Sequence, residues 1–259
     1  EKNSNIKNII LSKNFQKNVD QISQKNLDIV FFPDIGMSSE LYYLSFIRFA
    51  KIQITSWGHP ITTSNSSIDY FLSSKLLETK NAQEKFSEKL ILSDYLPMYF
   101  YKPKIRNILS EDEIVKKNFY FCSQNLMKMH PHFDEIVGKI LNKDKKSKIF
   151  FIKDKDEIMS KKLLERFKKN NLIDLERVKF FEKMGVEDYI NECGSSSVLL
   201  DTLYFGAGNS FHESMFYGTP TVTMPTDYLK SRIVLGAYKQ MKIDKPPVVS
   251  SVDEYVDCA

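Results

Sequence analysis

Short apolar runs rich in β-branched and aromatic residues alternate with longer amphipathic helix patterns along the whole chain. Examples are LDIVFFP (27–33), SKIFFI (147–152) and SVLLDT (197–202), and the patterns HFDEIVGKIL and DEIMSKKLLERFKKN are typical of helices. Strands buried on both faces of a parallel sheet have this near-continuous apolar character. The alternation therefore predicts an α/β fold with parallel sheets. Further strands are predicted at residues 53–57, 119–123, 177–181, 221–225 and 246–250.

One segment interrupts this rhythm. YKPKIRNILSEDEIVKKN (101–118) contains proline and many charges but no strand pattern, which is typical of an interdomain connection. We therefore predict a Rossmann-like domain at residues 1–105, a linker at 106–116 and a second Rossmann-like domain at 117–259. Because the chain lacks an initial Met and ends where VDEYVDCA predicts the start of a helix, we expect a fragment with an incomplete N-terminal domain.

The amino-acid composition indicates which binding partners and which cell compartment to expect. The net charge is +4, from 37 basic and 33 acidic side chains, which is too balanced to indicate a nucleic-acid or membrane partner. The three cysteines are odd in number and form no CxxC pair, so we expect neither a disulfide framework nor a zinc ribbon. No run approaches the roughly 20 apolar residues of a membrane span. These features together predict a cytoplasmic protein.

The loop GAGNSFHESMFYGTPTVTMP (206–225) follows a predicted strand and leads into a helix. Small residues let the backbone approach a ligand, and the free N–H groups of a helix start attract an anion such as a phosphate. Ser210 and Glu213 also have the spacing of a capping box, which needs no ligand, and the pattern alone favours this interpretation. The two roles are compatible. No Gly-Lys-Ser/Thr follows, so this is not a nucleoside-triphosphate loop.

The order of several motifs resembles the O-GlcNAc transferase family, glycosyltransferase family 41, over nearly the whole chain. The stretches that carry the resemblance are DIVFFPDIGMSSELYYLSFIRFAKIQITSWGHPITTSNSSIDYFLSS, FSEKLILSDYLPMYF, FYFCSQNLMKMHPHFDEI, RVKFFEKMGVEDYI, LLDTLYFGAGNSFHESMFYGTPTVTMP and TDYLKSR. The resemblance implies the GT-B fold, in which two Rossmann-like domains face a cleft. It also implies transfer of a sugar from a UDP-sugar to a protein, with inversion and with neither a metal nor another cofactor.

The resemblance also implies a UDP-sugar site. Lys128 falls where the family keeps a lysine on the diphosphate, and a cation there would offset the charge of the departing UDP. Met184 and Tyr189 fall beside the uracil, and Tyr189 replaces the histidine of the protein O-GlcNAc enzymes. The spacing of Asn209 and Glu213 is closer to the bacterial branch that attaches glucose to Asn, so the sugar and the acceptor atom stay open. The implied donor residues are Ser123, Asn125, Lys128, Met184, Tyr189, Gly208, Asn209, Ser210 and Glu213.

The N-terminal half supplies two candidates for proton transfer. His59 lies in WGHPITTSNSS (57–67), a loop that in the family borders the sugar and the acceptor. Its imidazole could accept a proton from an incoming hydroxyl, and a purely structural turn histidine is about as well supported. Asp34, in FFPDIGM, could act as a base or cap the helix that begins near Ser38, and the pattern favours the cap.

Two alternative functions compete with this interpretation. Asp154 and Asp156, in IFFIKDKDEI, have the spacing of the DxD motif of metal-dependent GT-A transferases, although a charged turn before a helix has the same sequence. The chain could also be a non-catalytic module that binds a nucleotide sugar.

The remaining histidines are expected to be structural. His130 and His132 flank a proline and more readily start a helix than bind a metal, and His212 is expected to be a half-buried helix histidine.

Overall fold

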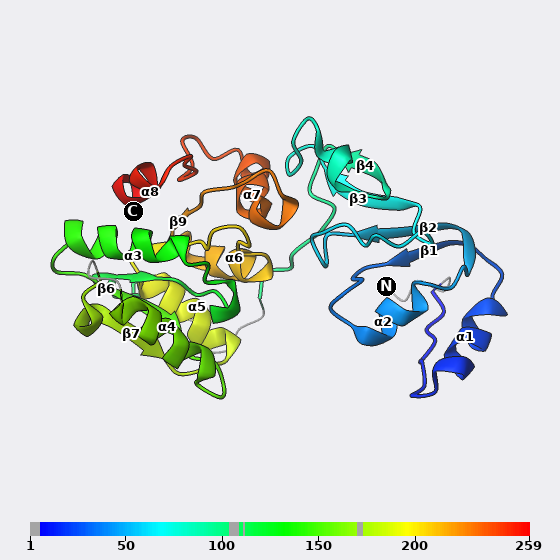
Figure 1. The fold of residues 1–259 in the computed structure, drawn as a ribbon, viewed down its shortest axis with the longest axis horizontal. Coiled ribbons are helices and arrows are strands. Elements are labelled where there is room, and N and C mark those ends of the chain that lie inside the picture. Colours follow the sequence, from blue (N-terminus) through cyan, green and yellow to red (C-terminus); the bar gives the residue numbers. More distant parts are fainter. Residues whose placement is uncertain (1–5, 104–108, 111, 170–172) are drawn as a thin grey trace. The chain divides into compact units, whose positions relative to one another are not determined.

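The chain forms two compact units. The computed structural model describes residues 6–103, 109–110, 112–169 and 173–259 (Figure 1). The first unit comprises the described residues up to Ser73 together with Asn81–Ser93, and the second comprises Ser74–Lys80 and the described residues from Asp94 onward. The predicted domain boundaries stay a prediction, and residues 104–105 of the predicted first domain and 106–108 and 111 of the predicted linker lie outside the described residues.

The first unit is built on a four-stranded sheet with the order β1-β2-β3-β4. Its elements are α1 (Phe15–Ser23), β1 (Leu27–Phe32), α2 (Ser39–Leu44), β2 (Ala50–Ser56), β3 (Tyr70–Ser74), a 3-10 turn at Ala82–Lys85 and β4 (Lys89–Ser93). β1, β2 and β3 are parallel. Val30 and Phe32 of β1 pack with Leu41 and Leu44 of α2, so this short helix covers one face of the sheet.

The second unit contains a five-stranded parallel sheet with the order β7-β6-β5-β8-β9. Its strands are β5 (Phe119–Phe121), β6 (Lys148–Ile152), β7 (Val178–Phe181), β8 (Val198–Leu200) and β9 (Thr221–Val222). Strands β6 and β7 lie in sequence on one side of β5, and strands β8 and β9 lie in sequence on its other side. The order therefore reverses between β5 and β8, which is the position where open α/β sheets bind ligands.

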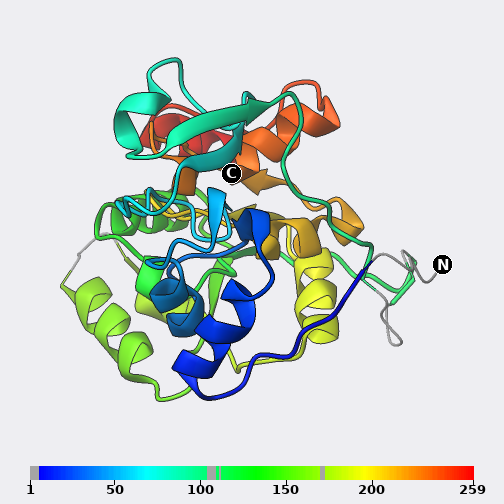
Figure 2. The same ribbon diagram turned by 90° about the vertical axis from the view of Figure 1, so that its right-hand side faces the viewer.

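Helices surround this sheet (Figures 1 and 2). They are α3 (His132–Lys143), α4 (Ile158–Lys168), α5 (Val186–Ser195), α6 (Asn209–Ser214), α7 (Ile233–Met241) and α8 (Val252–Cys258). Short 3-10 turns lie at Leu126–Lys128, Leu175–Arg177, Met215–Tyr217 and Leu229–Ser231.

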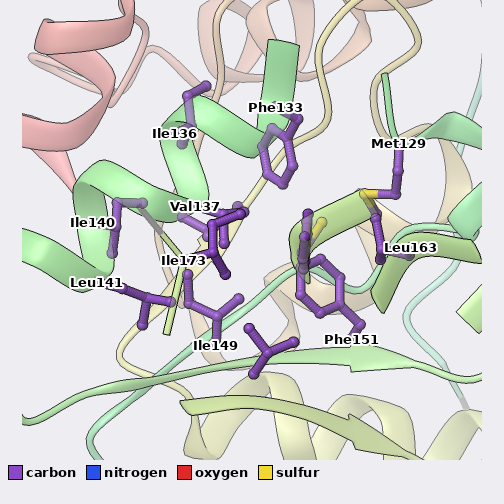
Figure 3. Packing of buried hydrophobic residues seen from close by; sticks show 14 of the residues in the cluster. Met129, Phe133, Ile136, Val137, Ile140, Leu141, Ile149, Phe151, Leu163 and Ile173 are labelled. Atoms are coloured by element: carbon purple, nitrogen blue, oxygen red, sulfur yellow. The ribbon is translucent and has the colours of Figure 1, made fainter. Parts of the chain in front are cut away.

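Alternating side chains of the strands form two cores in the second unit. Ile149 and Phe151 of β6 belong to a cluster with α3, α4 and α8, and Figure 3 shows Val137 and Leu141 on the side of α3 that faces these two residues. Phe150 and Ile152 project to the other face, where they pack with Ile190 of α5 and its neighbours. The sheet is thus apolar on both faces, as the near-continuous apolar runs predict.

The predicted α/β fold with parallel sheets is confirmed, and most of the predicted strands are present. The predicted strand at 246–250 is wrong, because this segment forms only an isolated bridge between Val248 and Thr223. β3 and β4 were not predicted from their sequences. The predicted helix after Ser251 is confirmed as α8, and the Ser251 hydroxyl accepts a hydrogen bond from the backbone N–H of Glu254.

Tyr255 of α8 connects the helix to the ends of two strands. Its side chain is fully buried, and its hydroxyl lies 2.8 Å from the carbonyl oxygen of Asp201 and 2.9 Å from that of Val222. We expect Tyr255→Phe to lower the free energy of unfolding by about 1–3 kcal/mol, because the buried carbonyl oxygen of Asp201 loses the hydroxyl donor, whereas that of Val222 keeps the backbone N–H of Asp201. Urea unfolding followed by circular dichroism measures this loss. Tyr101→Phe, at an exposed tyrosine, is the matched control, and equal midpoints for both variants would contradict the prediction.

Candidate functional site

A pocket of about 370 Å³ lies at the carboxyl edge of the five-stranded sheet, close to the reversal of strand order. It is lined by Ser123, Ile152, Lys183, Met184, Gly185, Val186, Tyr189, Ser210 and Glu213. Ser123 follows β5, Ile152 ends β6, and residues 183–185 follow β7. Val186 and Tyr189 lie on α5, and Ser210 and Glu213 lie on α6. Five of the nine residues in the predicted UDP-sugar site therefore line one pocket, namely Ser123, Met184, Tyr189, Ser210 and Glu213.

Tyr189 fixes the wall of this pocket. Only 8% of the residue is exposed, and its ring packs near Phe121 of β5. Its hydroxyl lies 3.0 Å from the carbonyl oxygen of Ser210 and 3.1 Å from the hydroxyl of Ser123. Burial raises the pKa of this phenol well above its ordinary value, so it stays neutral. Tyr189 thus joins α5, α6 and the loop after β5, and its predicted stacking on a base stays a prediction.

The predicted capping box of Ser210 and Glu213 is wrong. α6 begins at Asn209 with Gly208 as its N-cap residue, and no side chain caps it. Ser210 therefore lies inside the helix, and its hydroxyl accepts a hydrogen bond of 3.0 Å from the side-chain amide of Gln124. Glu213 is half-buried in the pocket wall, and burial raises the pKa of its carboxyl group.

Lys128 is held by two acceptors at the end of the turn Leu126–Lys128. Its ammonium group donates to the side-chain oxygen of Gln124 at 3.0 Å and to the carbonyl oxygen of Gly206 at 2.9 Å. It also lies 4.4 Å from the centroid of the Phe205 ring, within the range of a cation–π contact. Burial lowers the pKa of this ammonium group. Because Gln124 also bonds Ser210, one amide connects Lys128 to the start of α6.

Gln124 was not among the predicted site residues. It is buried and lies in SQN, three residues after the end of β5, where a polar residue following an apolar strand is a usable signal. Asn125, which was predicted, is exposed, and its side-chain oxygen accepts a hydrogen bond from the backbone N–H of Met127. Gly208 and Asn209 lie at the start of α6 and do not line the 370 Å³ pocket.

Asp154 has a structural role. One carboxylate oxygen accepts bonds from the backbone N–H and the hydroxyl of Ser160, and the other accepts from the backbone N–H of Met159. The Ser160 hydroxyl is the main reason that the pKa of Asp154 falls to about 2. Asp156 is exposed. The described part of the chain contains no cluster of three or more His, Cys, Asp or Glu side chains that could hold a metal ion.

The histidines of the second unit make ring contacts with neighbouring side chains. α3 begins at His132, which confirms the predicted helix start, and the ring of His132 lies 2.7 Å from the Tyr204 hydroxyl. His212 is half-buried on α6, as predicted, and its ring stacks on Phe100 with 3.6 Å between the centroids. Burial lowers the pKa of His212 to about 4, so its ring is neutral at pH 7.

The two proton-transfer candidates lie on neighbouring loops of the first unit. One carboxylate oxygen of Asp34 accepts a hydrogen bond of 3.2 Å from the backbone N–H of Ser38, the N-cap residue of α2. Asp34 is therefore not the helix cap that the pattern favours: Ser38 occupies the N-cap position and its own hydroxyl accepts a hydrogen bond from the backbone N–H of Leu41. Asp34 instead holds the backbone N–H of this cap residue. The ring of His59 packs on Gly36, where a Cβ atom would come within 2.7 Å of the ring, and its Nδ1 is buried with no partner among the described residues.

A buried carboxylate holds the loop that follows His59. Glu88 is 1% exposed and accepts hydrogen bonds of 2.8 Å from the Thr62 hydroxyl and from the backbone N–H of Thr63. The Thr63 hydroxyl also donates to it. Since a buried carboxylate is costly without such donors, these contacts favour one conformation of the hydroxyl-rich loop. This pairing joins residues far apart in the sequence and was not predicted.

Comparisons with known proteins agree with the predicted resemblance. No family model matches the chain. The chain is 25% identical over 238 residues to a UDP-glucose:protein N-beta-glucosyltransferase of Actinobacillus pleuropneumoniae, covering 89% of this chain and 37% of that protein. It is 22% identical over 223 residues to a probable UDP-N-acetylglucosamine–peptide N-acetylglucosaminyltransferase of Arabidopsis thaliana, covering 81% of this chain and 22% of that protein.

A solved structure has a similar fold. An O-GlcNAc transferase mutant of Thermobaculum terrenum matches with a TM-score of 0.81 at 18% sequence identity, covering 95% of this chain and 47% of that chain. The predicted similarity to O-GlcNAc transferases is thereby confirmed, and the chain spans less than half the length of each of these three proteins. Among the described residues, no helix is both long and apolar enough to span a bilayer.

The raised pKa of Glu213 sets the sign of a stability effect. The folded protein binds this proton more tightly than the unfolded chain, whose Glu pKa is about 4.3. The contribution of Glu213 to the free energy of unfolding is therefore greatest below about pH 4.3, the pKa in the unfolded chain, and it falls as the pH rises toward and through the pKa of the folded state. We expect Glu213→Gln to be at least as stable as the wild type at pH 7, with an advantage that shrinks on acidification. Thermal unfolding at several pH values measures this difference.

Glu165→Gln, at an exposed glutamate, is the control for the change of charge. A lower unfolding midpoint of Glu213→Gln at pH 7 would contradict the burial argument and would favour a helix-stabilising role for the carboxylate.

Proposed function

We propose that this chain is part of an inverting, metal-independent glycosyltransferase that moves GlcNAc or a hexose from a UDP-sugar to a protein side chain, on Ser, Thr or Asn. The observation that carries the proposal is the 370 Å³ pocket at the carboxyl edge of the parallel sheet. It gathers residues from distant parts of the sequence that the resemblance assigns independently to a UDP-sugar. The named activities of the similar proteins support the same substrate class.

The proposed donor position follows from the chemistry of the pocket. UDP would place its uracil near Met184 and Tyr189, and its ribose near Glu213, whose carboxylate can accept hydrogen bonds from hydroxyl groups. The diphosphate would lie near Lys128 and the loop before α6. A lysine that is already fixed by Gln124 and Gly206 loses little side-chain freedom when it binds an anion, which favours a preorganised charge.

The proposed reaction transfers the sugar in one displacement. The acceptor atom attacks the anomeric carbon while the bond from that carbon to the UDP oxygen breaks, and UDP leaves with the additional negative charge. Lys128 would stabilise this charge, and fixed positions of donor and acceptor would supply much of the remaining rate increase.

His59 is the proposed proton acceptor in preference to Asp34. A ring nitrogen of His59 lacks a partner among the described residues, whereas Asp34 already accepts a bond from Ser38.

Nucleotide binding separates the proposed roles of Lys128 and Glu213. We expect Lys128→Ala to weaken UDP about ten- to hundredfold, because a charge-assisted hydrogen bond is worth roughly 1.5–3 kcal/mol, and to leave uridine binding unchanged. Glu213→Ala should weaken both ligands, since both contain the ribose. Calorimetric titration in EDTA with UDP, uridine, UDP-GlcNAc and UDP-glucose measures these affinities, and the tighter nucleotide sugar indicates which sugar is transferred.

Lys161→Ala and Glu165→Ala are matched controls, because both side chains are exposed on α4 and lie outside the pocket. Equal UDP affinities for Lys128→Ala and Lys161→Ala would refute the diphosphate role. Absence of UDP binding by the wild-type chain would refute the donor site.

Turnover distinguishes an enzyme from a module that only binds the nucleotide sugar. We expect the wild-type chain to release UDP from its preferred UDP-sugar in the presence of EDTA and peptides that contain Ser, Thr and Asn. Lys128→Ala should reduce this rate at saturating donor, because the charge of the leaving UDP is no longer offset. Chromatographic quantification of UDP and of glycosylated peptide measures the reaction. UDP binding without transfer or hydrolysis would support the non-catalytic alternative.

A further inference from the structure

Asp201 is a buried carboxylate at the end of β8 to which neither the sequence motifs nor the proposed reaction gives a role. It is only 2% exposed. One carboxylate oxygen accepts a hydrogen bond of 2.7 Å from the Thr223 hydroxyl, and the other accepts one of 2.7 Å from the backbone N–H of Ala207. Asp201 therefore joins the loop before α6 to the residue that follows β9.

Gly206 connects Asp201 to Lys128. A Cβ atom at position 206 would lie 2.7 Å from one carboxylate oxygen of Asp201 and 3.0 Å from the other, so the backbone passes directly over this group. The carbonyl oxygen of the same Gly206 accepts the hydrogen bond from the Lys128 ammonium group. Asp201 and Lys128 thus hold adjacent residues of one loop, Gly206 and Ala207.

The two charges also act on each other. Burial lowers the pKa of Lys128, and the negative charge of Asp201 acts in the opposite direction. Burial raises the pKa of Asp201 to about 6, and the hydroxyl of Thr223, the N–H of Ala207 and the charge of Lys128 limit this rise. At neutral pH the carboxylate is therefore mostly ionised.

The other titratable groups near this pair are neutral at pH 7. They are the thiol of Cys122 and the phenols of Tyr238 and Tyr255, and burial raises the pKa of each of them. Among the described residues, Asp201 is thus the carboxylate whose negative charge raises the pKa of Lys128.

We propose that Asp201 is a positioning residue for the donor site: it supplies the counter-charge for Lys128 and holds the loop of residues 205–208 against the sheet. The inference rests on the proposed function, because it assigns the fixed lysine and loop to the diphosphate of a UDP-sugar. Asp201 itself contacts Thr223 and Ala207 and acts on the ligand only through Lys128 and the loop.

The test uses Asp201→Asn, which removes the charge and keeps the shape. The amide oxygen can still accept from the N–H of Ala207, and the amide nitrogen can donate to the Thr223 hydroxyl, which can rotate. UDP and uridine affinities are measured by calorimetry between about pH 7 and 9.5, where the terminal phosphate of UDP, with a pKa of about 6, is fully ionised.

We expect the variant to lose UDP affinity at lower pH than the wild type, because Lys128 loses its proton earlier without the counter-charge. A one-unit difference between the two pH profiles corresponds to a roughly tenfold weaker UDP affinity at the alkaline end. Uridine should bind both proteins equally throughout this range. Thr223→Val is the control, because it removes a hydrogen bond of Asp201 and keeps its charge, and its alkaline profile should follow the wild type.

Several outcomes would overturn the inference. One is an Asp201→Asn profile that coincides with the wild type. Another is an equal loss of UDP and uridine affinity at every pH, which would mean that Asp201 only supports the fold. Failure of the wild-type chain to bind UDP would instead refute the proposed function, and the inference with it.

A second measurement on the wild type covers the case in which Asp201→Asn does not fold. The NMR signal of Cε-labelled Lys128, assigned by its loss in Lys128→Arg, should shift as Asp201 ionises near pH 6. A Lys128 signal that is constant through this range would overturn the inference.

Discussion

The parallel pairing of β5 with β8 is the contact on which the candidate site depends. Tyr120 and Phe121 of β5 are in register with Val198 and Leu199 of β8, although the two strands lie far apart in the sequence. The strand order reverses between β5 and β8, and such a reversal is where open α/β sheets bind ligands. Lys128 follows the first strand and the loop to α6 follows the second, and this pairing brings them together.

Polar contacts then fix the loops that the sheet brings together. Gln124 joins Lys128 to Ser210, Tyr189 joins Ser123 to the backbone of Ser210, and the buried carboxylate of Asp201 holds Ala207. A buried polar group without a partner costs about 1–3 kcal/mol, so alternative loop conformations that break these bonds are disfavoured. Such a preorganised set of donors and charges suits a ligand whose negative charge increases during a reaction.

The sequence predicted the elements whose signal is local. β5, β6 and β8 are apolar nearly throughout, because helices cover both faces of their sheet. β3 and β4, YFLSS and KLILS, contain serines or a lysine among their apolar residues, and no residue of β4 is buried, so their patterns are weaker. The segment at 246–250 has the apolar residues of a strand, yet its two prolines lack the N–H groups that a sheet requires, and it forms a single bridge.

The capping box failed for a different reason, which also explains the residues that sequence reasoning missed. Ser210 and Glu213 have the spacing of a capping box, but the N-cap residue is Gly208, two residues before Ser210. The Ser210 hydroxyl bonds Gln124 instead. Gln124 and Ser210 are 86 residues apart, and a contact between such distant residues produces no periodic pattern in the sequence. Asp201 is an intermediate case, since an acid directly after a buried apolar strand implies buried partners. The sequence marks such a position, whereas only the folded structure identifies Thr223, Ala207 and Lys128 as the groups around it.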